Sequence, residues 1–196
     1  RHGVLVTHVA SREGLMADGG GAWGYAEAKQ AGADELLYDS IGVGAGAAAV
    51  LRDKRDIKTQ GWSAAGAVVN PEALYPPNVK PGTPGARKNK DQFYNAKAQG
   101  WWMLRDRFIA TFKAVTDHRN GIPFTGDPDN LISLSSGIAE LQQLKPELSQ
   151  VTFGYNNAGK IVINKAPDGH RSPNRADSVM IAFAPKKAAF AVIGVF

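Results

Sequence analysis

The chain has 196 residues, 43% of them hydrophobic, which is enough to bury one substantial core. It contains no cysteine, and this excludes disulfides, thiolate zinc sites and cysteine nucleophiles. No apolar run approaches the roughly 20 residues that a membrane span needs, so we expect no membrane partner. The formal net charge of +5 mildly favours a polyanionic partner but does not identify one.

The first predicted elements alternate between strand and helix. Residues 4–9 have strand character at the very start of the chain, so we interpret the sequence as a piece of a longer polypeptide. A helix is predicted over residues 22–31, with Gly32 as its C-terminal stop. Residues 35–39 are mostly apolar and end in an acid, which predicts a buried strand that carries Asp39 at its C-terminal end.

A glycine-rich turn and a further strand follow. Residues 42–46 read Gly-Val-Gly-Ala-Gly and predict a tight turn into an alanine-rich helix over residues 47–52. Residues 64–69 are small and apolar and predict another inner strand. The alternation of strand, helix and strand favours an α/β sheet with at least some parallel pairing.

A proline-rich basic loop is predicted at about residues 70–91. It holds five prolines, and a segment of this kind inside a domain is usually functional or mobile. Its basic side chains, Arg87, Lys88 and Lys90, could hold a DNA backbone, because a flexible basic loop can follow phosphates. An ordinary charged surface loop is the alternative.

The second half of the chain predicts two helices, a turn and a hairpin. A long helix over residues 91–117 carries apolar side chains at steps of three to five, which should pack on the core. A turn at residues 127–129, a helix over residues 133–148 and a hairpin over residues 151–164 follow. The adjacent tryptophans of the long helix are interpreted as core packing. Its apolar stripe consists of Phe93, Ala96, Trp101, Leu104, Phe108, Phe112 and Val115.

The last predicted helix begins at Ser172 and Pro173, because serine is a good N-cap and proline suits the first helical position. This helix places Asp177 among Ala, Val, Met, Ile and Phe side chains. A carboxylate in such surroundings is costly to bury unless it is paired or holds a cation. From this segment alone, a solvated aspartate and a metal ligand are both open.

Several common sites find no support in the sequence. No two of the four histidines have the helical spacing of zinc ligands. There is no Gly-x-Ser-x-Gly elbow and no Gly-Lys-Ser/Thr phosphate loop. The glycines of residues 42–46 lack dinucleotide-binding spacing, and Asp39 ahead of them would repel a pyrophosphate. A nucleotide-binding α/β enzyme is therefore the weakest alternative.

Two acids stand out, Asp39 at the end of an inner strand and Asp177 on a helix near the end of the chain. Mg²⁺ and Mn²⁺ prefer oxygen ligands and complete their shells with water and phosphate. Two such ions held about 3.5–4 Å apart can activate water and stabilise the leaving oxygen in phosphodiester cleavage. We therefore expect the two carboxylates to converge on one site for Mg²⁺ or Mn²⁺.

Four motifs occur in a familiar order. They are Asp-Ser-Ile-Gly-Val-Gly-Ala-Gly (39–46), Asn-Ala-Lys-Ala-Gln-Gly-Trp-Trp-Met-Leu-Arg (95–105), Asp-Pro-Asp-Asn-Leu-Ile-Ser (127–133), and Gly-Lys (159–160) followed by Ser-Pro-Asn-Arg-Ala-Asp (172–177). Over residues 4–183 the sequence resembles the C-terminal nuclease domain of large terminase subunits of tailed bacteriophages. The resemblance implies one domain over residues 1–196 with a ribonuclease H-like fold, a mixed sheet flanked by helices. It also implies an N-terminal ATPase domain that these residues do not include.

The resemblance further implies a metal-dependent endonuclease that cuts concatemeric viral DNA during genome packaging, with two Mg²⁺ or Mn²⁺ ions in the complete site. Sites of this family use three main acids, of which Asp39 corresponds to the second and Asp177 to the third. The first lies on an opening strand ahead of residues 4–9, and no residue here fills that place. Asp18 falls in a predicted loop and is not assigned to it. We therefore expect a sheet without its first strand and an incomplete site.

Two more residues lie on the segment that passes the active site in the family. By resemblance, Lys165 would contact the scissile phosphate and Asp168 would be an auxiliary metal ligand, and a solvated turn is the alternative for both. The implied partners are double-stranded DNA, the small terminase subunit and the portal or procapsid, in the host cell cytoplasm. The alternative function is a ribonuclease H-like module that binds DNA or a packaging partner without cutting.

Overall fold

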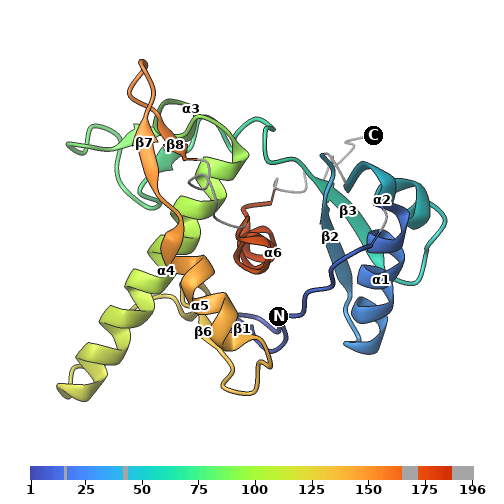
Figure 1. Ribbon diagram of the computed structural model, residues 1–196. Helices are drawn as coiled ribbons and strands as arrows, with labels where there is room; N and C mark the ends of the chain where they lie inside the picture. Colours follow the sequence, from blue (N-terminus) through green and yellow to red (C-terminus); the bar gives the residue numbers. More distant parts are fainter. Residues whose placement is uncertain (16, 42–43, 165–171, 187–196) are drawn as a thin grey trace, which may run out of the picture.

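The computed structural model describes residues 1–15, 17–41, 44–164 and 172–186, except for the side chains of residues 17, 18, 44 and 45. Two parts are evident in Figure 1, one with α1, α2, β2 and β3 and one with the other elements, and α6 lies between them. The helices are α1 (Ala17–Gln30), α2 (Gly44–Leu51), α3 (Asn89–Gln92), α4 (Ala96–Arg119), α5 (Leu141–Gln150) and α6 (Asn174–Phe183), with a 3₁₀ turn at Pro128–Asn130. The strands are β1 (Leu5–Val6), β2 (Glu35–Asp39), β3 (Lys58–Trp62), β4 (Leu74–Tyr75), β5 (Arg87–Lys88), β6 (Ser133–Leu134), β7 (Phe153–Tyr155) and β8 (Ile161–Ile163).

The strands of the described ranges pair two by two, in both directions. β1 is parallel to β6 and β2 is parallel to β3, whereas β4–β5 and β7–β8 are antiparallel. In the β2–β3 ladder Asp39 lies opposite Trp62, at the C-terminal ends of both strands. Helix α2 connects these two parallel strands, as a parallel crossover requires. The predicted mixed α/β class is confirmed.

Helices α1 and α2 pack on each other beside the β2–β3 ladder (Figure 1). Their approach depends on Gly21, because a Cβ at that position would lie 2.8 Å from the Cα of Ala47. The predicted helix stop is also present, since Gly32 follows α1 with a φ of +62°. The strand predicted over residues 35–39 matches β2 residue for residue.

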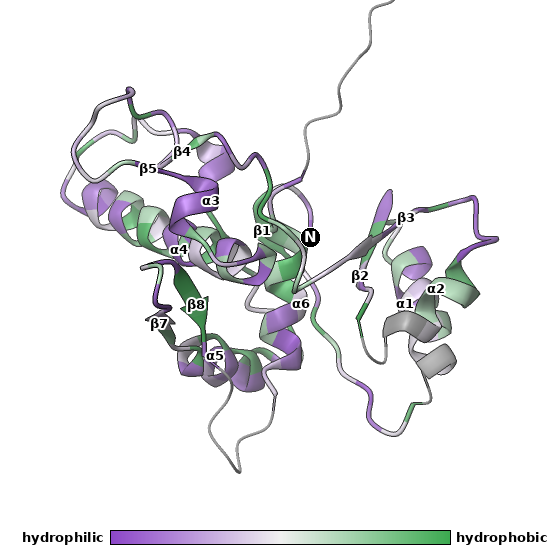
Figure 2. Ribbon diagram, turned by 90° about the horizontal axis from the view of Figure 1, so that it is seen from above, coloured by the Kyte–Doolittle hydropathy of each residue, from purple (hydrophilic) through white to green (hydrophobic). Residues whose placement is uncertain are grey.

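The main hydrophobic core lies where α4, α5 and α6 meet β1 and β6, and Figure 2 shows hydrophobic stretches along the ribbon of α6. Gly100 lets α4 and α6 come close, because a Cβ there would lie 2.6 Å from the Sδ of Met180. A smaller cluster beneath β4 and β8 contains the rings of Tyr75 and Phe93, edge to face at 5.1 Å. The buried members of the main core are Val6, Val9, Trp101, Leu104, Ile132, Ile138, Leu144, Ala176, Val179, Met180, Ile181 and Phe183.

The strand predicted over residues 64–69 is wrong, since β3 is the strand that pairs with β2. The backbone of this segment bonds to α4 instead, where the carbonyl of Gly66 accepts from the N–H of Ala96 at 2.8 Å. The side chain of Gln99, which is fully buried, accepts from the N–H of Val69 at 2.7 Å and donates to its carbonyl at 3.0 Å. These backbone groups are satisfied by α4, so no strand partner is needed.

The long helix predicted over residues 91–117 is interrupted. Phe93 has an extended backbone and a buried ring, and α4 begins only after Asn95, whose side chain accepts from the N–H of Ala98 at 2.9 Å as an N-cap. The apolar stripe also continues past the core, because Phe112 is 74% exposed. The second half of α4 therefore projects from the domain (Figure 1).

The helix predicted over residues 133–148 is correct only in its second part. Ser133 and Leu134 form β6, whose partner β1 is shorter than the strand predicted over residues 4–9, and α5 begins at Leu141. The N–H of Ser133 donates to the carbonyl of Val4 at 2.9 Å, so the parallel ladder takes residues that local helix propensity would place in α5. The predicted hairpin is present as β7 and β8.

The proline-rich segment is tied to its surroundings by polar contacts. β4 and β5 pair across it, and Lys88 and Lys90 both contact Glu72, at 2.7 and 2.6 Å. The guanidinium of Arg87 donates to the carbonyl of Gly159 at 2.9 Å, in the turn between β7 and β8. Each of the three basic side chains predicted to face DNA therefore has a protein partner.

Candidate active site

Asp39 occupies the end of β2, where parallel pairing with β3 fixes the backbone. Its Oδ1 accepts a hydrogen bond from the N–H of Ile41 at 3.0 Å, which turns the chain away from the strand. The N–H of Ser40 donates to the carbonyl of Trp62 at 2.8 Å and holds the same turn to β3. Asp39 is exposed, so a firmly held strand end presents its carboxylate to solvent.

Asp177 lies in the first turn of α6, and its side chain is 24% exposed. Two side chains of α4 reach it. The indole N–H of Trp101 donates to Oδ1 at 3.2 Å, and the Nζ of Lys97 lies 3.8 Å from the same oxygen. Lys97 and Trp101 are four residues apart and share one face of α4. One hydrogen bond and one loose ion pair are modest compensation for a largely buried carboxylate.

Burial raises the pKa of Asp177 above its usual value, because the charged form loses solvation. The ammonium of Lys97 and the indole N–H of Trp101 lower the pKa and oppose this effect. The negative charges of Asp39 and Glu147 raise it further. The charge of Asp39, which is distant in the sequence, therefore acts on Asp177, so the two carboxylates lie in the same region of the fold.

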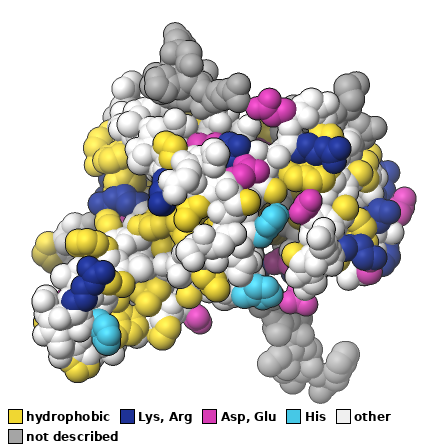
Figure 3. Space-filling view, turned by 60° about the horizontal axis from the view of Figure 1, so that its bottom comes forward, with side chains coloured by type: hydrophobic (Ala, Val, Ile, Leu, Met, Phe, Trp, Pro, Cys, Tyr) yellow, Lys and Arg dark blue, Asp and Glu magenta, His cyan; other side chains and the backbone are white. Residues whose placement is uncertain are grey.

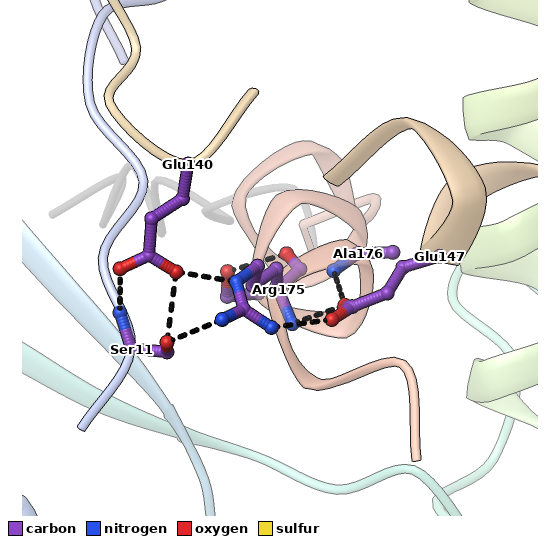
Figure 4. Close-up of polar contacts among 6 residues, drawn as sticks. Ser11, Glu140, Glu147, Arg175 and Ala176 are labelled. Carbon is purple, nitrogen blue, oxygen red and sulfur yellow. Dashed lines mark hydrogen bonds and ion pairs between the residues drawn. The ribbon is translucent and has the colours of Figure 1, made fainter. Parts of the chain in front are cut away.

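The N-terminus of α6 is capped by Glu147 of α5, and not by Ser172 as predicted. The Oε2 of Glu147 accepts from the backbone N–H groups of Arg175 and Ala176, at 2.7 and 3.1 Å (Figure 4). Neither Ser172 nor the residue at the N-cap makes a side-chain capping bond within the described structure. A carboxylate satisfies the free N–H groups and interacts favourably with the helix dipole, so this contact fixes the first turn of α6.

The side chain of Arg175 extends the cap into a network of four residues (Figure 4). Its guanidinium pairs with Glu147 at 2.7 Å and with Glu140, and it donates to the hydroxyl of Ser11 at 2.7 Å. The N–H and the hydroxyl of Ser11 donate in turn to Glu140, at 2.9 and 2.8 Å. The network connects α6 to α5 and to the segment after β1, and so fixes the position of the helix that carries Asp177.

Of the other predicted site residues, Arg87, Lys88 and Lys90 lie on β5 and at the start of α3. Lys165 and Asp168 lie outside the described residues, and the side chain of Asp18 is not described either. Within the described ranges no group of three or more His, Asp or Glu side chains is arranged to hold a metal ion. Asp39 and Asp177, whose charges interact, carry oxygen donors of the kind that Mg²⁺ and Mn²⁺ take together with water and phosphate.

Three residues that act on Asp177 escape prediction from the sequence. Trp101, predicted to be core packing, is indeed only 6% exposed, but its N–H is directed at the carboxylate. The sequence does carry a signal for Lys97, because it precedes Trp101 by one helical turn within the motif of residues 95–105. Glu147 had no local signal, since a cap supplied by another helix depends on the tertiary fold.

Solved structures of one nuclease domain resemble the chain over almost its whole length. The nuclease domain of the large terminase subunit gp2 of bacterial virus Sf6 is 28% identical with a TM-score of 0.79, and the match covers 95% of this chain and 80% of that one. A mutant of this domain with manganese is 29% identical, with a TM-score of 0.79 and coverage of 95% and 81%. A mutant with calcium is also 29% identical, with a TM-score of 0.79 and coverage of 95% and 80%.

No protein-family model and no curated protein sequence matches the chain. The similarity to these solved structures confirms the ribonuclease H-like fold that the resemblance implies. It also supports a relation to the nuclease family.

Proposed function

We propose that this chain, which resembles the nuclease domain of a large terminase subunit in both fold and sequence, is a metal-dependent endonuclease that cuts concatemeric viral DNA during packaging. One observation carries the proposal: the chain matches the nuclease domain of a large terminase subunit over 95% of its length, with a TM-score of 0.79. Two carboxylates that repel each other, one of them largely buried, are stabilised by a shared cation. The neighbours solved with manganese and with calcium support a divalent ion.

In this proposal Asp39 and Asp177 are the catalytic carboxylates and hold Mg²⁺ or Mn²⁺, with two ions in the complete site. Bound ions would supply the positive charge that activates water and stabilises the leaving oxygen. Trp101 holds Oδ1 of Asp177 through its N–H, which orients the carboxylate. Lys97, 3.8 Å from Oδ1, provides a positive charge beside any phosphate that approaches Asp177.

The remaining contacts are proposed for DNA outside the pair of acids. Lys165 would contact the scissile phosphate and Asp168 would be an auxiliary ligand. Arg87, Lys88 and Lys90 would contact the backbone of double-stranded DNA. Because Lys88 and Lys90 both bind Glu72, contact with phosphate requires them to exchange that carboxylate for DNA.

The place of action follows from the same proposal. The small terminase subunit and the portal or procapsid would be the protein partners, in the host cell cytoplasm. Within the described ranges, no helix has the length and apolar character to cross a membrane.

The test is plasmid nicking by this chain and by a version extended upstream, each with Mg²⁺, Mn²⁺ or a chelator. We expect nicking that needs the metal, is stronger in the extended chain, and is abolished by Asp39→Asn. If neither protein nicks the plasmid with Mg²⁺ or Mn²⁺, the proposal is contradicted.

A second candidate is a ribonuclease H-like module that binds DNA or a packaging partner without cutting. This candidate is favoured by the lack of a ligand cluster, because no group of three or more acids or histidines among the described residues is arranged to hold a metal ion. The two candidates differ in one measurement. Binding of duplex DNA without metal-dependent nicking in the extended chain would favour the binding module.

A further inference from the structure

An apolar groove lies between α4, the C-terminal end of α5, and the β7–β8 hairpin. Its volume is about 500 Å³, and its walls include Trp102 and Phe108 of α4, Leu148 of α5, and Phe153 and Ile163 of the hairpin. The rings of Trp102 and Phe153 meet edge to face at 4.7 Å, and Phe153 is 44% exposed. A groove of this size with aromatic walls has the shape and lining that ligand sites usually have.

The groove continues into an exposed apolar stripe on α4. Ile109, which lines the groove, is 50% exposed, and Phe112 and Val115 beyond it are 74% and 45% exposed. The three residues follow one another at steps of three, so they share one side of the helix. In Figure 3 hydrophobic side chains gather on the projecting arm at the lower left. Exposed apolar surface that is continuous with a groove marks an interaction site.

The charged groups at the groove are basic. Arg105 and Lys145 are among its lining residues, and none of the described lining residues is an acid. Lys145 has no ion pair within the described ranges. The guanidinium of Arg105 lies 4.5 Å from the ring centre of Trp102, and among the described residues its ion pair is with the adjacent Asp106, at 3.1 Å. A ligand that presents apolar groups flanked by carboxylates would complement this surface.

We propose that the groove and the stripe form a docking surface for an acidic amphipathic helix of a partner protein. A helix places apolar side chains at steps of three and four, which match both the groove and the exposed positions of α4. Acidic residues flanking those positions would pair with Arg105 and Lys145. A second copy of this chain is disfavoured, because each copy carries a net charge of +5 and brings the same basic residues to the contact. The surface includes neither Asp39 nor Asp177, and although Trp101 lines the groove, the docking proposal does not rest on nuclease activity.

The test uses a labelled synthetic peptide of about 18 residues, with leucine on one helical face and glutamate elsewhere. A matched peptide with lysine in place of glutamate is the control ligand. Fluorescence anisotropy should give at least tenfold tighter binding of the acidic peptide, with an affinity that falls as salt rises. Equal binding of both peptides, or no binding of the acidic one at about 1 mM, would overturn the proposal.

Variants of the chain locate the contact. Phe112→Asp should weaken binding at least tenfold and Lys145→Glu about threefold or more. Ile41→Asp is the matched control, because Ile41 is also exposed, at 46%, but lies in the other part of the molecule. All three residues are exposed, and circular dichroism checks that the variants fold. An unchanged affinity in Phe112→Asp would contradict the proposal, as would a wild-type dimer that this substitution dissociates in sedimentation, which would assign the surface to a second copy.

Discussion

The indole N–H of Trp101 donates to the carboxylate of Asp177 across 3.2 Å, so a nearly buried ring of α4 and the acid of α6 form one unit. This contact gives a core residue a role in the proposed site. It also lowers the pKa of Asp177, against the larger opposite effect of burial. The balance leaves a carboxyl whose ionised form is costly to the free protein and would be stabilised by a cation.

Removing the charge of Asp177 should abolish cleavage and stabilise the fold. In the extended chain, we expect Asp177→Asn to lower the rate of plasmid nicking at least about 100-fold, because a ligand of the metal is lost. The pKa of Asp177 is raised in the folded protein, so its ionisation destabilises the fold as pH rises from the ordinary value of 3.8 through the folded value. The variant should therefore melt at a higher temperature near pH 7, and the difference should vanish below about pH 3.8. Wild-type nicking rates would refute the assignment.

Lys97 should set the pH at which the site binds metal. Its charge lowers the pKa of Asp177, so Lys97→Met should raise that pKa further. The carboxylate must be ionised to bind a metal. The pH below which the affinity for Mn²⁺ falls should therefore be higher in the variant. Isothermal titration with Mn²⁺ across pH measures the shift. Lys113→Met is the matched control, since Lys113 pairs with Asp117 within α4, and an equal shift in both variants would count against the prediction.

Glu147 should stabilise α6 and hence the position of Asp177. Glu147→Ala removes the acceptor of two backbone N–H groups and an ion pair with Arg175. We expect the free energy of unfolding to fall by about 2 kcal/mol, from urea denaturation. Glu72→Ala is the control, because Glu72 makes only exposed ion pairs, with no measurable loss expected. Equal losses in the two variants would contradict the role of the cap.

Gly100 should be intolerant of even a methyl group. A Cβ at this position would lie 2.6 Å from the Sδ of the buried Met180, and 3.9 Å from the Cβ of Ala184. Overpacking of about 1–3 kcal/mol should exceed the gain of about 1 kcal/mol that alanine brings to a helix. Gly100→Ala should therefore unfold at lower urea, whereas Gly24→Ala, with open space around it in α1, should not. Unchanged or greater stability of Gly100→Ala would mean that Met180 moves aside without cost.

The basic residues around β5 should bind DNA through phosphates. Replacing Lys88 and Lys90 by alanine should weaken duplex binding equally across sequences and reduce the salt slope by about 2. Glu72→Gln should have the opposite effect, because both lysines then lose their protein partner. Affinity is measured by anisotropy with two unrelated duplexes. If neither substitution changes affinity, this segment is a surface loop or a docking site rather than a DNA contact.

Elements whose signals are local could be predicted from the sequence. The β2 strand ends at Asp39 as predicted, and the β7–β8 hairpin follows its turn residues. The strand predicted over residues 64–69 is wrong, because small apolar side chains occur both in strands and in packed loops. The backbone of Val69 bonds to a side chain of α4, which the local sequence does not reveal. Phe112 was predicted to pack on the core but is exposed, because a periodic apolar pattern does not show where along a helix the core ends.

The residues around the two acids were less predictable, because they come from elements that are distant in the sequence. The sequence identifies Asp39 and Asp177 as candidates, since each is an acid next to apolar residues. The residues that tune Asp177 come from α4 and α5, and only the tertiary fold brings them there. Glu147 caps α6 across a helix–helix contact, and no spacing rule within one segment can reveal such a pair.

Trp101 is shared by two surfaces, since it lines the apolar groove and also holds the carboxylate of Asp177. A ligand that shifts this ring would change the binding free energy of a cation at Asp177. A cation that reorients the carboxylate would in return change the binding free energy of a ligand in the groove. Thermodynamic linkage makes the two effects equal in size. A partner that fills the groove would thereby raise or lower the metal affinity of the proposed site without contacting either carboxylate, so that assembly and the proposed cleavage would be coupled through one indole.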